Sequence, residues 1–140
     1  MKFKQINITG FKSFFDKTTF LIEDGLTGIV GPNGCGKSNI VEALRWCMGE
    51  NSAKSMRGSG MEDIIFSGTS NRPSKNISEV SLILDNQNKE GPSHFKEFDE
   101  VLVRRKIEKD KGSKYYINDK EVRARDVQTL FADLSTGAHS

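Results

Sequence analysis

The sequence has few of the residues that mark secreted, membrane-spanning or metal-binding proteins. Its 140 residues include two Cys, two His and three Pro. Cys35 and Cys47 have neither a CxxC partner nor a zinc-like spacing, and His94 and His139 each stand alone. No apolar run approaches the roughly 20 residues that cross a bilayer, and the N-terminus lacks the apolar core of a signal peptide. We therefore expect a reduced cytoplasmic chain without a membrane partner.

What is present is the composition of a soluble globular domain. Hydrophobic residues make up 35% and charged residues 29% of the chain, and the net charge of +2 favours no class of partner by itself. The length allows one core of ordinary size but not two. Because no internal repeat or low-complexity tract occurs, residues 1–140 are expected to form one unit.

Hydrophobic spacing predicts strands, a helix, more strands and a last helix, in that order. The predicted strand segments are 3–9, 18–23, 26–30, 76–87, 98–109 and the hairpin 111–122. The first helix follows residue 36 and places Ile40, Leu44 and Met48 on one stripe, with Gly49 at its C-cap. The second helix, 124–134, has helical spacing at Val127, Leu130, Phe131 and Leu134. This order predicts an α/β fold of mixed α+β character, with a mixed sheet that contains an antiparallel part and lacks the strands of a complete nucleotide-binding sheet.

A phosphate-binding loop lies between the strand 26–30 and the first helix. Gly31, Gly36, Lys37 and Ser38 fit the pattern G-x-x-x-x-G-K-[ST], with an apolar strand before it and an amphipathic helix after it. Glycines let successive backbone N–H groups turn toward an anion, and the helix N-terminus adds its dipole. Lys37 would reach the β- and γ-phosphates of ATP, and the Ser38 hydroxyl would ligate Mg²⁺. The expected nucleotide-binding residues here are Gly31, Pro32, Asn33, Gly34, Cys35, Gly36, Lys37 and Ser38.

The acidic residue that such a site needs for hydrolysis is missing from the chain. Only the segment 79–85 is an apolar run that ends in an acid, Asp85. Its alternation places Val80, Leu82 and Leu84 on one face, as in a half-exposed antiparallel strand rather than a buried parallel one. We therefore expect Asp85 not to be a metal ligand and the catalytic acid to lie elsewhere.

Four segments resemble the N-terminus of bacterial SMC proteins, the structural-maintenance-of-chromosomes ATPases of the ABC superfamily. They are ITGFKSF, GPNGCGKSNIVEALRWCMGE, SAKSMRGSGMEDIIFSGT and YYINDKEVRARDV, and they occur in the family's order. The resemblance implies the N-terminal lobe of a split head. The family's glutamine loop would follow Ser140, and its signature motif, acidic strand and switch histidine would lie on a C-terminal lobe, beyond a long coiled coil and hinge.

The resemblance also implies roles for residues outside the loop. Arg57 matches the family's arginine finger, which a flexible setting and a planar guanidinium would suit, although a solvated surface arginine is the alternative. Lys12 and Ser13 resemble positions close to the nucleotide, or else mark a strand end. Asn39 belongs to the family pattern GKSN and could equally cap the helix.

Basic residues near the C-terminus suggest a DNA-binding surface. Arg123 and Arg125 match basic positions on the face of SMC heads where DNA is clamped, and Arg104 and Arg105 lie in a basic run of the strand 98–109. Such residues would contact phosphates without reading sequence. Acidic residues are interspersed among them, so an ordinary solvated face is the alternative.

The sequence therefore predicts the ATP-binding lobe of an SMC head that acts in chromosome condensation and segregation. The implied partners are DNA, a second copy of the protein, its own C-terminal head lobe, a kleisin and the kleisin's winged-helix associate. Hydrolysis is expected only when the C-terminal lobe and a second head complete the site. Alternatives are the lobe of a split-head repair ATPase, a nucleotide-dependent DNA-binding or dimerisation module without turnover, and a small-molecule kinase.

Overall fold

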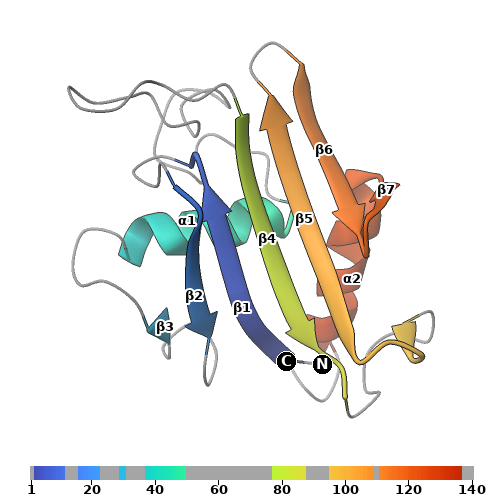
Figure 1. The fold of residues 1–140 in the computed structure, drawn as a ribbon. Coiled ribbons are helices and arrows are strands. Elements are labelled where there is room, and N and C mark those ends of the chain that lie inside the picture. Colours follow the sequence, from blue (N-terminus) through green and yellow to red (C-terminus); the bar gives the residue numbers. More distant parts are fainter. Residues whose placement is uncertain are drawn as a thin grey trace, which may run out of the picture.

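The fold is an antiparallel sheet with two helices on one of its faces, as seen in a computed structural model (Figure 1). The structure describes residues 2–11, 16–22, 29–30, 37–49, 77–87, 95–108 and 111–136. The strands are β1 (Lys2–Thr9), β2 (Thr18–Ile22), β3 (Ile29–Val30), β4 (Ile77–Asp85), β5 (Glu100–Glu108), β6 (Gly112–Ile117) and β7 (Lys120–Val122). The helices are α1 (Lys37–Cys47) and α2 (Ala124–Thr136). The strand order is β3-β2-β1-β4-β5-β6-β7.

One face of the sheet is apolar because every second residue of each central strand points toward the helices. The register aligns Ile6 with Leu82, Leu82 with Val103, and Val103 with Ile117, which makes a continuous row across four strands. The first three of these side chains are 0% exposed, and Ile117 is 7% exposed. The alternation predicted for the segment 79–85 is confirmed, since β4 pairs antiparallel with both of its neighbours.

Both helices pack on this apolar face through the stripes that their spacing predicts. Ile40 and Leu44 of α1 are buried, as are Val127, Leu130 and Phe131 of α2, and Met48 is partly buried. The side chain of Leu134 lies outside the described residues. Trp46 is fully buried although the predicted stripe did not include it. Gly49, with φ of 106°, ends α1 in the left-handed region as a C-cap glycine does.

The hairpin between β6 and β7 turns at Asn118 and Asp119, whose φ angles are 50° and 68°. Two consecutive left-handed residues make the tight turn that suits the twist of a hairpin, and Asn and Asp tolerate this conformation. Asn118 also exchanges two 2.8 Å hydrogen bonds with the backbone of Leu102: its Oδ1 accepts from the Leu102 N–H, and its N–H donates to the Leu102 oxygen. The predicted hairpin is therefore confirmed, and its turn is anchored to β5.

Every strand pairing among the described residues is antiparallel. The strand predicted at 26–30 is described only as Ile29–Val30, which pairs with β2 at one edge of the sheet. Neither helix in the described ranges is long and apolar enough to span a membrane.

Candidate functional site

The predicted nucleotide site is described only at the start of α1. The helix begins at Lys37, so the backbone of Lys37, Ser38 and Asn39 forms its first turn, while the side chains of these three residues are not described. The loop residues 31–36, together with Lys12, Ser13 and Arg57, lie outside the described residues. Their roles therefore stay predictions.

The first turn of α1 is suited to an anion. The first N–H groups of a helix have no partner within the helix, and the helix dipole adds a partial positive charge there. No acidic residue occurs in this turn, while Arg45 lies in the last turn, where a cation complements the dipole. The backbone at this end of α1 therefore favours a bound anion such as a phosphate. Within the described ranges, no cluster of His, Cys, Asp or Glu could hold a metal ion by itself.

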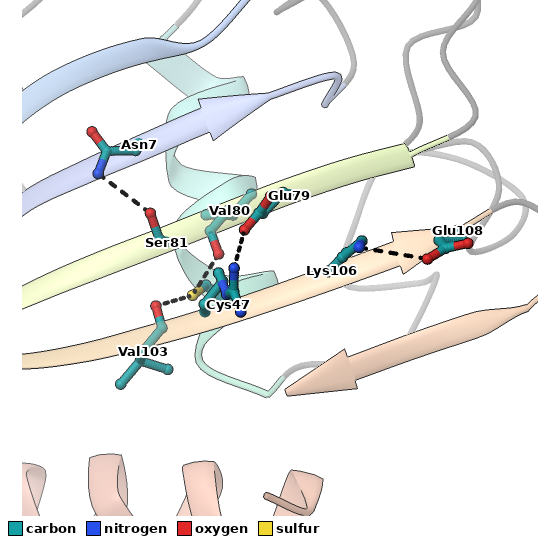
Figure 2. Close-up of polar contacts among 9 residues, drawn as sticks. Asn7, Cys47, Glu79, Val80, Ser81, Val103, Lys106 and Glu108 are labelled. Carbon is teal, nitrogen blue, oxygen red and sulfur yellow. Dashed lines mark hydrogen bonds and ion pairs between the residues drawn. The ribbon is translucent and has the colours of Figure 1, made fainter. Parts of the chain in front are cut away.

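Cys47 attaches the last turn of α1 to the middle of the sheet. Figure 2 shows its sulfur between β4 and β5, 3.5 Å from the backbone oxygens of both Val80 and Val103, which share its single S–H donor. Burial raises the pKa of the Cys47 thiol to about 12, against a smaller opposing effect of Arg105. A neutral, buried thiol with this geometry serves packing and not chemistry.

Arg105 is buried beneath α1, and the prediction that it contacts DNA is wrong. Its side chain is 1% exposed, and its guanidinium lies 4.5 Å from the ring centres of both Trp46 and Tyr115. Nη1 donates to the Trp46 oxygen at 2.9 Å, and Nε and Nη2 donate to Ser113 Oγ. Burial lowers the pKa of Arg105 to about 10, so the group stays charged at neutral pH.

A signal for this burial was present in the sequence. Arg105 is in phase with Val101, Val103 and Ile107, all of which are buried on the helix-covered face of β5. The period of two places Arg105 inside for the same reason that it places the valines inside. Arg104 and Arg105 therefore do not form one basic run on a single face of the strand.

Arg104 lies on the opposite face of β5, where it has partners of its own. Its Nη1 is 3.1 Å from Glu79 Oε1, and its guanidinium stacks 4.3 Å from the ring centre of Tyr116. On the same strand, Lys106 is 3.5 Å from Glu108 (Figure 2). These ion pairs reduce the positive charge that Arg104 offers to a phosphate backbone, and its predicted DNA contact remains untested.

Arg123 and Arg125 are brought together at the exposed N-terminus of α2. The Arg123 N–H donates to Asp126 Oδ2 at 2.9 Å, and the Asp126 N–H donates to the Arg123 oxygen at 3.0 Å, which caps the helix. Two cations at the positive end of a helix dipole are unfavourable on their own. An external anion at this position would relieve the repulsion.

Residues 2–138 match the family model described as the RecF/RecN/SMC N terminal domain. The chain belongs to this family. Its fold matches the N-terminal lobe of an SMC head, of the ABC type. A solved structure from work on ATP-driven dimerization and DNA-stimulated activation of SMC ATPases superposes with a TM-score of 0.85 at 30% identity, covering 99% of this chain and 82% of that one.

Two further relatives place the chain within the family. The Chromosome partition protein Smc of Cereibacter sphaeroides is 56% identical over 140 residues, which are all of this chain and 12% of that protein. An Smc head domain with an extended coiled coil, derived from Pyrococcus furiosus and bound to the C-terminal domain of ScpA, superposes with a TM-score of 0.81. It is 31% identical, and the match covers 94% of this chain and 33% of that one. The chain thus spans about an eighth of its curated relative.

Proposed function

We propose that the chain is the ATP-binding half of an SMC head. The observation that carries this proposal is the start of α1 at Lys37, directly after the glycine-rich segment, with no acidic residue in the first turn. The residues that would bind the triphosphate are Gly31, Pro32, Asn33, Gly34, Cys35, Gly36, Lys37, Ser38 and Asn39, with Lys12 and Ser13 nearby. Ser38 would hold Mg²⁺, which neutralises phosphate charge when bound.

Hydrolysis would require parts that the described residues do not supply. β4 is antiparallel and ends at Asp85, whose Oδ1 accepts from the Gln87 N–H at 2.9 Å, so it does not resemble the buried parallel strand that carries a catalytic acid. A C-terminal lobe and a second head would supply the remaining groups, and Arg57 would approach the nucleotide when two heads meet. The relative studied for ATP-driven dimerization supports this arrangement.

The nucleotide proposal is tested by replacing Lys37 in the full-length protein that carries this chain. We expect Lys37→Ala to weaken ATP binding at least tenfold, because the lysine is the point charge on the β- and γ-phosphates. Lys96→Ala, at an exposed lysine outside the site, is the matched control. Binding is measured with a fluorescent ATP analogue and competed with unlabelled ATP. Equal affinities for Lys37→Ala and the wild type would contradict the proposal.

DNA binding is proposed for Arg123 and Arg125, with Arg104 as a weaker contributor. Arg123 directly precedes α2, Arg125 lies in its first turn, and both are exposed, which suits sequence-independent contacts to phosphates. We expect the double change Arg123→Ala and Arg125→Ala to lower DNA affinity about tenfold and to reduce the salt dependence by about two counterions. Arg45→Ala, at an exposed arginine on α1, is the control. An unchanged salt dependence would count against this surface.

The wider role that we infer is DNA capture and chromosome segregation by a homodimer with a kleisin and its winged-helix associate. The structure bound to ScpA supports the kleisin as a partner, and the chromosome partition relatives support the role in segregation. A split-head repair ATPase remains the alternative from the same family, and 56% identity to a chromosome partition protein argues against it. A module without turnover would show no ATPase activity when joined to its C-terminal lobe. The antiparallel sheet disfavours a small-molecule kinase.

A further inference from the structure

The C-terminal end of α1 is held by an arginine from the sheet. Arg105 reaches from β5 and donates Nη1 to the Trp46 oxygen at 2.9 Å. This oxygen belongs to the last turn of α1, whose carbonyls have no partner further along the helix. It also accepts the Gly49 N–H at 3.1 Å. The arginine therefore fixes a specific backbone atom of the helix and not only a side chain.

The surroundings of Arg105 hold its guanidinium in one plane. Trp46 and Tyr115 lie on the guanidinium at 4.5 Å each, and Ser113 Oγ accepts from Nε at 3.3 Å and from Nη2 at 3.1 Å. The negative end of the α1 dipole and two aromatic faces both stabilise a cation. A lysine could supply the charge but not the planar stack or the forked donors. The planar, multiply donating guanidinium of arginine therefore fits this position, and the ammonium group of lysine does not.

The ring contacts around Arg105 continue from Trp46 to Phe11, the residue directly before Lys12. Trp46, which contacts Arg105, also contacts Phe11, with 5.6 Å between ring centres and 50° between ring planes. Phe11 is 0% exposed and comes directly before Lys12 in the chain. Arg105 thus supports, through one tryptophan, both the helix that starts at Lys37 and the segment that leads to Lys12.

We propose that Arg105 is a positioning residue for the nucleotide site, which it serves by fixing the C-terminal end of α1 on β5. This inference rests on the proposed ATP-binding function. The 11 residues of α1 span roughly 16 Å, so a tilt of about 5° at the Trp46 end moves the first turn by about 1.4 Å. A displacement of about 1 Å can be costly where charges must meet a phosphate.

Two substitutions in the full-length protein test whether Arg105 affects ATP binding by positioning α1 or only by stabilising the fold. Arg105→Met keeps apolar volume between the rings, but it removes the donors to the Trp46 oxygen and to Ser113 Oγ and is therefore expected to lower the urea unfolding midpoint. We expect ATP binding, measured without urea where the variant is folded, to weaken about tenfold. Tyr115→Leu removes one of the two aromatic rings that stack on the Arg105 guanidinium and leaves Arg105 in place. We expect it to lower the ATP affinity about threefold.

The matched control is Arg45→Met, which makes the same change at an exposed arginine of the same helix. We expect it to leave the ATP affinity unchanged and to lower the midpoint only slightly, because Arg45 complements the helix dipole in the last turn. Hydrogen exchange of the amides of residues 31–38 provides a second readout, because a displaced first turn would gain less protection from added ATP. That protection would be reduced in Arg105→Met and Tyr115→Leu and unchanged in Arg45→Met.

Two outcomes overturn the inference. One is a folded Arg105→Met or Tyr115→Leu protein with wild-type ATP affinity and wild-type protection of residues 31–38. The other is a loss of affinity that merely follows the fraction unfolded, which assigns Arg105 a purely structural role. If Lys37→Ala also binds ATP normally, the proposed function itself fails. If Lys37→Ala loses binding and the Arg105 and Tyr115 variants do not, only the positioning role fails.

Discussion

Arg104 and Arg105 are neighbours in the sequence, yet the pleat of β5 places them on opposite faces of the sheet. The Arg104 side chain is 31% exposed and pairs with Glu79 across the open face. Arg105 is 1% exposed and is enclosed by Trp46, Tyr115 and Ser113 on the helix-covered face. The two arginines therefore have different roles. Successive side chains of a strand point to opposite faces, so one faces solvent and the next faces the core.

The two faces of the sheet differ in the same way beyond these arginines. The open face carries a polar ladder, in which the Asn7 amide donates to Ser81 Oγ at 3.3 Å and accepts from Thr19 Oγ1 at 2.7 Å. Figure 2 shows Asn7 and Ser81 on neighbouring strands. The covered face carries the apolar row, and Cys47 of α1 packs against this face. Stability is therefore expected to depend mainly on the covered face, and four predictions test this comparison.

The largest expected effect is on the reactivity of Cys47. A pKa raised by burial to about 12 leaves the folded thiol about a thousandfold less ionised at pH 8 than a thiol of ordinary pKa 9.0. We expect iodoacetamide to label Cys47 only after unfolding, as measured by peptide mass spectrometry. The free energy of unfolding should also fall between pH 9 and 10, since the unfolded chain then loses a proton that the folded chain keeps. Rapid labelling of the native protein would contradict the buried position.

The next largest effect is a difference in the free energy of unfolding between variants of two adjacent residues of β4. Leu82 is 0% exposed, while Ile83 is half-buried on the open face. We expect Leu82→Ala to lower the free energy of unfolding by about 2–5 kcal/mol, because it leaves a cavity in a close-packed core. Ile83→Ala should lower it by about 1 kcal/mol. Urea unfolding of both variants measures the difference. Equal losses of unfolding free energy would contradict the expectation that stability depends mainly on the covered face.

A smaller effect is expected at the joint between the helices. A Cβ on Gly49 would lie 2.7 Å from Gln128 Cγ, and moving Gln128 would lose the 2.9 Å hydrogen bond from its Nε2 to the Gly49 oxygen. We expect Gly49→Ala to cost about 2–3 kcal/mol. Gly112→Ala is the control: its φ is 78°, but no atom lies within 4 Å of the added Cβ. The control should cost about 1 kcal/mol, which isolates the backbone strain from the collision.

The smallest effect is expected at the ion pair on the open face. Arg104 and Glu79 are each about a third exposed, so solvent screens their attraction. A double-mutant cycle with Arg104→Gln and Glu79→Gln should give a coupling energy of about 0.5 kcal/mol that falls further in 1 M salt. A coupling several times larger would mean that the open face contributes more to stability than its exposure implies.

Local patterns in the sequence were enough to predict most of the elements. Alternation placed Val80, Leu82 and Leu84 on one face, and helical spacing placed Ile40, Leu44, Val127 and Leu130. The Asn118–Asp119 turn followed from residues that tolerate positive φ. Trp46 and Arg105 were missed because a tryptophan beside an apolar stripe and a basic residue in a strand usually face solvent at least in part. Their mutual contact joins two residues that lie 59 positions apart in the chain.

The sequence by itself determined the period of each element, the turn chemistry and the order of segments that the family model matches, because these depend on near neighbours along the chain. The alternation along β5 already placed Arg105 on the inner face, and only the tertiary structure decided which part of α1 it holds. That choice is made by the register of β5 under α1, which brings Arg105 into contact with the last turn of the helix. A buried cation becomes favourable only after helix dipole, aromatic rings and hydroxyl have been assembled around it.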